Sequence, residues 1–154
     1  MADYKIPVIT GTELAAGDVL RWSGSAWVNY SDSEFREASL SFVIDGGGVA
    51  ITTGIKGDLE VPFNCSINSV TLVADQSGSI VVDIWKQAYA DFPPENAETI
   101  TSTTPPTITT AVKSQDTTLT SWTVALTKGD TLRFNVDSVT TIERVTLSLK
   151  VDRT

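Results

Sequence analysis

Length, composition and charge exclude several classes of function. A chain of 154 residues is long enough for one domain and a short extra segment. Its 19 acidic residues outnumber 11 Lys and Arg, and the charge of -8 repels phosphate backbones and anionic lipid headgroups. There is no His and a single Cys, which excludes Ser-His-Asp catalysis, disulfide frameworks and cysteine-rich zinc sites. We therefore expect no nucleic-acid or membrane partner, no cofactor, no metal and no enzymatic activity.

The first predicted element is a β-hairpin in residues 17–30. Two short runs, each containing one Trp, flank a Ser-Gly-Ser turn. An isolated two-stranded hairpin is only marginally stable in water, so its large aromatic side chains should pack against something outside it. Trp22, Trp27 and Tyr30 are therefore the candidate attachment and assembly residues. Ligand binding by these indoles and a simple hairpin core remain alternatives.

The sequence predicts two parts, an N-terminal arm of residues 1–36 and a domain of residues 37–154. A polar, acidic link at 31–37 joins them. Independent domains below about 40 residues usually need disulfides, metals or oligomerisation, and neither a disulfide nor a zinc cluster is available here. The arm is therefore expected to oligomerise or to dock on a larger assembly. The chain begins without a signal peptide and contains no run of about 18 apolar residues, so we expect synthesis in a cytoplasm.

The predicted domain shows the period-two alternation of half-buried β-strands. Alternating apolar residues occupy the windows 59–63, 70–74, 80–84, 122–126, 132–136 and 145–151. Turn residues at 75–78 and 128–130 predict hairpins between neighbouring strands. The fold class is therefore all-β, an antiparallel β-sandwich of about eight strands preceded by the short hairpin arm.

Two segments of this domain depart from the strand pattern. Residues 85–92 form the one plausible helical turn, which the prolines at 93 and 94 would end. Residues 101–110 are rich in Thr and Pro and predict a long, extended surface loop.

The aromatic residues around this helical turn are the candidate ligand or interface residues. Trp85, Tyr89 and Phe92 lie at a strand end and in the irregular segment after it, where binding residues tend to gather. Beside Asp83 and Lys86, their flat rings would suit a sugar. Two alternatives remain open: the rings cap the core of the sandwich, or they bury against a neighbouring copy of the chain.

Acidic and glycine-rich segments are interpreted as structural. The Asp-Gly-Gly-Gly run at 45–48 lacks the Gly-Lys-Ser/Thr of a phosphate loop and predicts a connection between strands. Asp75, Asp91, Asp130 and Asp137 stand at strand ends or turns, where Asp usually bonds its own backbone and less often calcium. No short motif marks a carboxylate pair for glycoside hydrolysis.

Two parts of the sequence resemble structural proteins of tailed bacteriophages. Residues 17–30 are similar to the Gly-Asp-x-Leu-x-Trp-x-Gly-x-x-Trp-Val-Asn units of phage fibres and surface appendages. The segments 42–63, 72–86 and 129–138 resemble, in this order, a domain that recurs in phage structural proteins, and the likeness spans about 40–152. The resemblance implies a jelly-roll type of sandwich, a homotrimer, and a place on the virion without catalytic residues.

We therefore expect a non-enzymatic virion protein, a short fibre or a capsid decoration displayed on the particle surface. Its expected partners are its own copies and other virion proteins, the latter bound through residues 1–36. The alternative is an adhesin module that binds a host-surface glycan through the loop aromatics.

Overall fold

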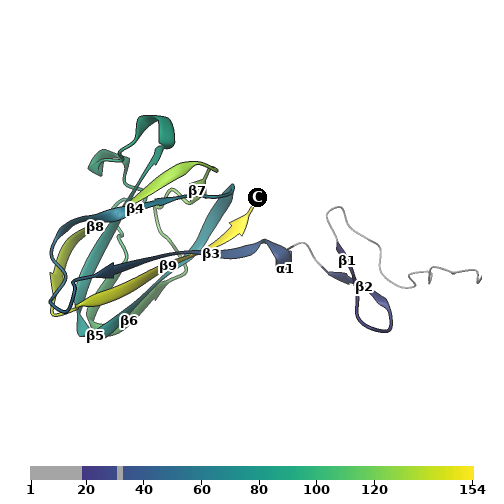
Figure 1. Cartoon of the computed structure of the whole chain (residues 1–154), viewed down its shortest axis with the longest axis horizontal. Helices are drawn as coiled ribbons and strands as arrows, with labels where there is room; N and C mark the ends of the chain where they lie inside the picture. Colours follow the sequence, from purple (N-terminus) through teal and green to yellow (C-terminus); the bar gives the residue numbers. More distant parts are fainter. Residues whose placement is uncertain (1–18, 31–32) are drawn as a thin grey trace, which may run out of the picture. The chain divides into compact units, whose positions relative to one another are not determined.

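The computed structural model describes residues 19–30 and 33–154, with residues 29, 30, 33 and 34 described by their backbone alone. The chain forms two compact units, Met1–Glu37 and Ala38–Thr154. The boundary lies one residue beyond the predicted end of the arm. The two units are described separately below (Figure 1).

The N-terminal unit contains the predicted hairpin. Strands β1 (Val19–Trp22) and β2 (Trp27–Tyr30) pair antiparallel, and their register sets Trp22 opposite Trp27. The turn is closed by a backbone hydrogen bond of 2.8 Å from Ser23 N to Ala26 O. Gly24 at its tip has a φ of +100°, a conformation that other residues rarely adopt. A single helical turn, α1 (Ser33–Arg36), follows the hairpin.

The C-terminal unit is built from β-strands, which confirms the predicted all-β class. Its strands are β3 (Glu37–Asp45), β4 (Gly54–Glu60), β5 (Cys65–Ala88), β6 (Thr107–Asp116), β7 (Ala125–Leu126), β8 (Asp130–Thr140) and β9 (Arg144–Arg153). They form one sheet in the order β3-β9-β5-β8-β4, and β6 and β7 pair with β5 outside this path (Figure 1). Strand β5 pairs antiparallel with β6, β7, β8 and β9.

The long strand β5 belongs to both halves of the curled sheet. Its residues 65–74 pair with β9, whereas its residues 79–88 pair with β8. The hairpin predicted at 75–78 is therefore wrong, because these residues lie within β5. The turn-forming residues mark an irregular place in the strand, where its pairing with β6 shifts register. Gly78 is required here, since a Cβ atom would lie 2.4 Å from the carbonyl oxygen of Thr140.

The core lies between the two halves of this sandwich-like sheet. Phe42 of β3 stacks on Phe134 of β8 with ring centroids 4.3 Å apart and planes inclined by 10°. The fully buried residues of this core include Leu72, Ile80, Ile84, Leu132, Leu147 and Leu149. Each such side chain contributes about 1.5–3 kcal/mol when it is removed from water. Most of these residues belong to the windows whose alternation predicted strands.

Two further predictions about connections are corrected by the structure. Residues 85–88 continue β5, and helical structure follows only as the short 3-10 turns η1 (Tyr89–Asp91) and η2 (Asn96–Glu98). The Lys128–Asp130 turn exists, with Asp130 N bonded to Thr127 O at 3.0 Å. However, β7 and β8 on its two sides pair with β5 and not with each other, because the turn joins different parts of the sheet.

The predicted surface loop at 101–110 is also wrong in large part. Thr101 and Ile108 are completely buried, and β6 begins at Thr107. Backbone groups of this region pair with β5: Ile100 N donates to Ile84 O at 2.9 Å, and Val82 N donates to Pro106 O at 3.0 Å. Thr-rich composition predicts exposure, but here the hydroxyl groups find partners inside the protein.

Candidate functional site

The Trp hairpin, defined as β1 and β2 with their turn, is the leading candidate site. The indoles of Trp22 and Trp27 meet edge to face, with centroids 5.6 Å apart and an interplanar angle of 61°. Edge-to-face contact is a preferred geometry for aromatic pairs. Even so, the two residues remain 47% and 43% exposed. The pair is therefore ordered within the hairpin and still available to a partner.

The third residue of this candidate set, Tyr30, is placed by its backbone only. The register sets its Cα opposite Val19 at the open end of the hairpin. Its side chain lies outside the described residues. The structure thus places Tyr30 on the same two-stranded element as Trp22 and Trp27, at the opposite end.

Trp85, the first of the loop aromatics, is a buried residue in the single chain. Its exposed fraction is 8%, and its Nε1 donates a 2.6 Å hydrogen bond to Asp83 Oδ2. Residue Thr99 forms an isolated β-bridge with it. This geometry matches the alternative in which the ring caps the sandwich, and it leaves little of the indole for stacking on a sugar.

Asp83 is the centre of a buried hydrogen-bond network that includes Trp85. Its Oδ1 accepts the backbone N–H of Ile84 at 2.8 Å and the hydroxyl of Thr99 at 2.6 Å. The Thr101 hydroxyl donates to the same oxygen. With the Trp85 donor on Oδ2, this carboxylate receives four hydrogen bonds while only 7% exposed. The network holds residues 99–101 against β5.

The other two loop aromatics lie in a different environment. Tyr89 in η1 is 78% exposed, the largest exposed fraction among the large hydrophobic side chains described. Phe92 is also exposed, and the guanidinium of Arg133 lies 5.1 Å from its ring centroid. The structure therefore does not bring Trp85 into one exposed aromatic surface with Tyr89 and Phe92.

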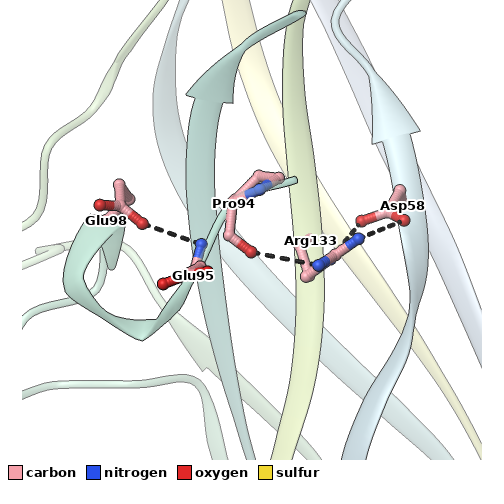
Figure 2. Close-up of polar contacts among 5 residues, drawn as sticks. All are labelled: Asp58, Pro94, Glu95, Glu98 and Arg133. Atoms are coloured by element: carbon pink, nitrogen blue, oxygen red, sulfur yellow. Dashed lines mark hydrogen bonds and ion pairs between the residues drawn. The ribbon is translucent and has the colours of Figure 1, made fainter. Parts of the chain in front are cut away.

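Arg133 fixes the segment that carries these two residues. Figure 2 shows its guanidinium between Asp58 of β4 and Pro94 of the loop. Nε and Nη2 bond the two carboxylate oxygens of Asp58 at 2.7 and 3.1 Å, and Nη1 bonds the Pro94 carbonyl at 3.2 Å. The hydrogen bonds that Arg133 donates to the Asp58 carboxylate raise the pKa of Arg133. This clamp was not predicted, because its acid and base are far apart in the sequence.

A capping box orders the following turn. Glu95 N donates to Glu98 Oε2 at 2.8 Å (Figure 2), and the Glu95 side chain accepts from the third residue of η2. Such reciprocal caps satisfy backbone donors that a short helix leaves unpaired. The Arg133 clamp and the box fix residues 94–98, and Tyr89 at the start of this segment is exposed to solvent.

The acidic and glycine-rich segments at 45–48 and 128–130 form turns, whereas Asp75 and Asp137, which were predicted at strand ends or turns, lie within β5 and β8. Gly47 N donates to Asp45 Oδ1 at 2.6 Å, an Asx turn within the Gly-rich connection between β3 and β4. Asp130 Oδ2 accepts from Thr127 N at 2.8 Å and lies 3.5 Å from Lys86 Nζ. Within residues 19–30 and 33–154, no three His, Cys, Asp or Glu side chains gather in a metal-binding group.

The functional argument for this chain rests on the geometric observations above. Comparison with protein-family models and with curated proteins gives no match to this chain. In the described part of the chain, no helix has the length and apolar character needed to cross a membrane.

Proposed function

We propose that this chain is a non-enzymatic structural protein of a bacteriophage virion, a homotrimeric short fibre or capsid decoration. In this proposal the Trp hairpin attaches and assembles the protein, and the domain, a jelly-roll-like sandwich, projects from the particle surface. The observation that carries the proposal is the pair of ordered, half-exposed indoles on an element too small to have a core. The resemblance of residues 17–30 to units of phage fibres supports the same conclusion.

The free energy gained by burying the two indoles of one hairpin is small, which favours binding through several hairpins at once. A Trp buries roughly 150–250 Å² in a core, and the exposed half of each indole is about 70–120 Å². At about 25 cal/mol per Å², burying both would contribute roughly 4–6 kcal/mol. Association costs at least a comparable amount of translational and rotational freedom, so a single hairpin would hold a partner weakly. A trimer would present three hairpins at once, which raises the effective affinity without new contacts.

The polar groups of the domain support a structural and not a catalytic role. Asp83 and Arg133 each make several side-chain hydrogen bonds, and both use them to hold a loop on the sheet. The sequence contains no His, the commonest general acid–base group.

The test is incorporation into particles. A tagged wild-type chain and the double variant Trp22→Ser/Trp27→Ser would be supplied to a phage-infected culture, and particles would be purified and quantified by mass spectrometry. We expect the wild type in stoichiometric amounts and the double variant depleted, because the serines remove the apolar contacts. The matched control is Tyr89→Ser, which changes an exposed aromatic outside the hairpin and should incorporate normally. Wild-type chain absent from the particles would contradict the proposal.

A second candidate function is glycan binding by the domain, and the exposed Tyr89 on its ordered loop favours it. A flat ring held on a pre-ordered loop loses little conformational entropy when a sugar stacks on it. Glycan arrays would compare the wild type with Tyr89→Ala. Binding that disappears in this variant, with unchanged thermal stability, would support the adhesin; equal binding would remove Tyr89 from that role.

A further inference from the structure

A small pocket in the domain is formed by strands β5 and β6 and by the Pro-containing segment that precedes β6. Its volume is about 200 Å³. Pockets for drug-sized ligands usually measure about 300–1,000 Å³, so this one suits a group of about the size of one side chain. The pocket is lined by Val70, Leu72, Thr104, Pro105, Pro106, Thr107, Ser114 and Asp116.

Two polar residues of β6 lie at this pocket on the inner face of the sheet. The register sets Asp116 opposite Val70 and Ser114 opposite Leu72. Opposed residues of an antiparallel pair project to the same face, and here Val70 and Leu72 belong to the hydrophobic core. Polar residues at core-facing positions weaken a fold unless they have a function. Core packing therefore gives no reason for a serine and an aspartate at these two positions.

The Asp116 carboxylate is held in place and has one oxygen available to a ligand. Its Oδ1 accepts the backbone N–H groups of Thr118 and Leu119 at 2.8 and 3.3 Å. Among residues 19–30 and 33–154, neither Asp116 Oδ2 nor Ser114 Oγ has a hydrogen-bond or ion-pair partner. Both residues are half-buried, so a ligand in the pocket could reach these oxygens.

The other polar side chains of the pocket can only accept further hydrogen bonds. The Thr104 hydroxyl donates its hydrogen to Thr120 O at 2.7 Å, and the Thr107 hydroxyl donates to Pro105 O at 2.8 Å. A hydroxyl has one hydrogen, so both oxygens are left as acceptors. Pro105 and Pro106 have no backbone N–H. The pocket thus combines one negative charge and neutral acceptors with apolar walls.

The proline wall of the pocket is ordered by hydrogen bonds within the domain. Trp122 Nε1 donates to Thr104 O at 3.0 Å, and Val82 N donates to Pro106 O at 3.0 Å. A wall that is already ordered loses little conformational entropy when a ligand binds.

From these observations we propose that the pocket binds a primary alkylammonium group, either a free amine or the side chain of a lysine. An ammonium has three donors and no acceptor, which matches Asp116 Oδ2 and the neutral acceptors beside it. Its alkyl chain would pack against the prolines, and the net charge of -8 attracts cations. Calcium would need six to eight oxygen ligands, and a sugar would bring acceptors as well as donors. This inference goes beyond the proposed virion role and does not depend on it.

Binding would be measured by NMR on the ¹⁵N-labelled full-length chain. The probe is pentylammonium chloride, titrated at constant ionic strength, and 1-pentanol is the neutral control of the same length. We expect pentylammonium to shift the amide signals of residues 104, 107, 114 and 116 and the Trp122 indole N–H signal in a saturable manner. Pentanol should leave these signals unchanged, because it has no charge to pair with Asp116.

The variant Asp116→Asn removes the charge and keeps the turn, because the amide oxygen can accept the same two backbone N–H groups. We expect its affinity for pentylammonium to fall about tenfold or more. Asp45→Asn is the matched control, since Asp45 caps a similar turn outside the pocket and should leave the affinity unchanged. Ser114→Leu fills the pocket without altering the Asp116 turn, so it should also abolish binding and tests the site if Asp116→Asn fails to fold.

The outcomes are distinct. Signals that do not saturate, equal shifts with pentanol, or full affinity in Asp116→Asn or Ser114→Leu would overturn the proposal. Nα-acetyl-lysine amide, titrated in the same way, distinguishes the two sources of the ammonium. Binding at least as tight as that of pentylammonium would assign the pocket to a lysine of a partner protein, whereas weaker binding would assign it to a free amine.

Discussion

Replacement of Asp83 by Asn should destabilise the domain strongly, although the two side chains have the same shape. The Asp83 carboxylate accepts three hydrogen bonds on Oδ1 and the Trp85 indole N–H on Oδ2. An amide offers one acceptor oxygen, and its NH₂ group would then face the indole donor. The variant loses a hydrogen bond to a charged group and buries two opposed donors.

The expected cost follows from these contacts. Hydrogen bonds to charged groups contribute about 1.5–3 kcal/mol, and an unsatisfied buried group costs about 1–3 kcal/mol. We expect a loss of about 3 kcal/mol in the free energy of unfolding. For a domain of this size that is roughly 10 °C in Tm.

A double-mutant cycle identifies the cause of the loss. Trp85→Phe removes the indole donor, so in the double variant the amide no longer opposes another donor. The combined loss should be smaller than the sum of the two single losses by about 1–2 kcal/mol. Urea unfolding followed by far-UV circular dichroism measures all three variants. Asp91→Asn, in the exposed turn η1, is the matched control and should change stability by less than about 0.5 kcal/mol.

Two outcomes would refute the reasoning. Wild-type stability in Asp83→Asn would mean that the carboxylate is not the acceptor of these four hydrogen bonds. Strict additivity in the cycle would mean that Asp83 and Trp85 act independently. Either result would remove the Asp83 network as the reason for the placement of Trp85.

Three further predictions concern other parts of the domain. Gly78→Ala should lower the free energy of unfolding by about 2–3 kcal/mol, because its Cβ atom would lie 2.4 Å from the carbonyl oxygen of Thr140. Thermal denaturation measures this loss, and an unchanged Tm would contradict the close approach. Arg133→Lys should lower the free energy of unfolding by about 1 kcal/mol, because Lys cannot form the paired hydrogen bonds to the Asp58 carboxylate. Protease should also cleave residues 89–98 faster in this variant. The same cleavage rate as in the wild type would argue against the clamp. The buried Cys65 thiol has a raised pKa, so its folded form stays protonated where the unfolded form ionises. Iodoacetamide at pH 8 should therefore react far more slowly with native than with urea-unfolded protein, and equal reaction rates would contradict the burial of Cys65. The free energy of unfolding should fall as the pH rises above 9.0, because only the unfolded thiol ionises readily.

The period-two pattern predicted the strands well where one face of a strand is buried. Leu132, Phe134 and Leu149 all occupy the core positions that the alternation indicated. It failed at residues 75–78, because turn-forming residues also occur where a long strand changes partners. Local composition does not distinguish that irregularity from a hairpin. The close approach of Gly78 to Thr140 of β8, which requires glycine there, becomes evident only in the folded structure.

The candidate sites that could be predicted depend on residues that lie close together in the sequence. The Trp hairpin was predictable because its residues lie close in the sequence and its turn has a specific residue pattern. The Arg133 clamp and the burial of Thr101 were not, since each depends on partners that the fold brings from distant positions. Arginine, aspartate and threonine are ordinarily surface residues, and their partners become evident only in three dimensions.

The solution mass of the purified full-length chain tests most directly whether the Trp hairpin assembles the protein. Light scattering should give a trimer of three 16.5 kDa chains for the wild type. The variant Trp22→Ser/Trp27→Ser should give a folded monomer, with the far-UV circular dichroism of the domain unchanged. A wild-type monomer across the accessible concentration range would contradict assembly through the hairpin, as would a trimer that survives loss of both indoles.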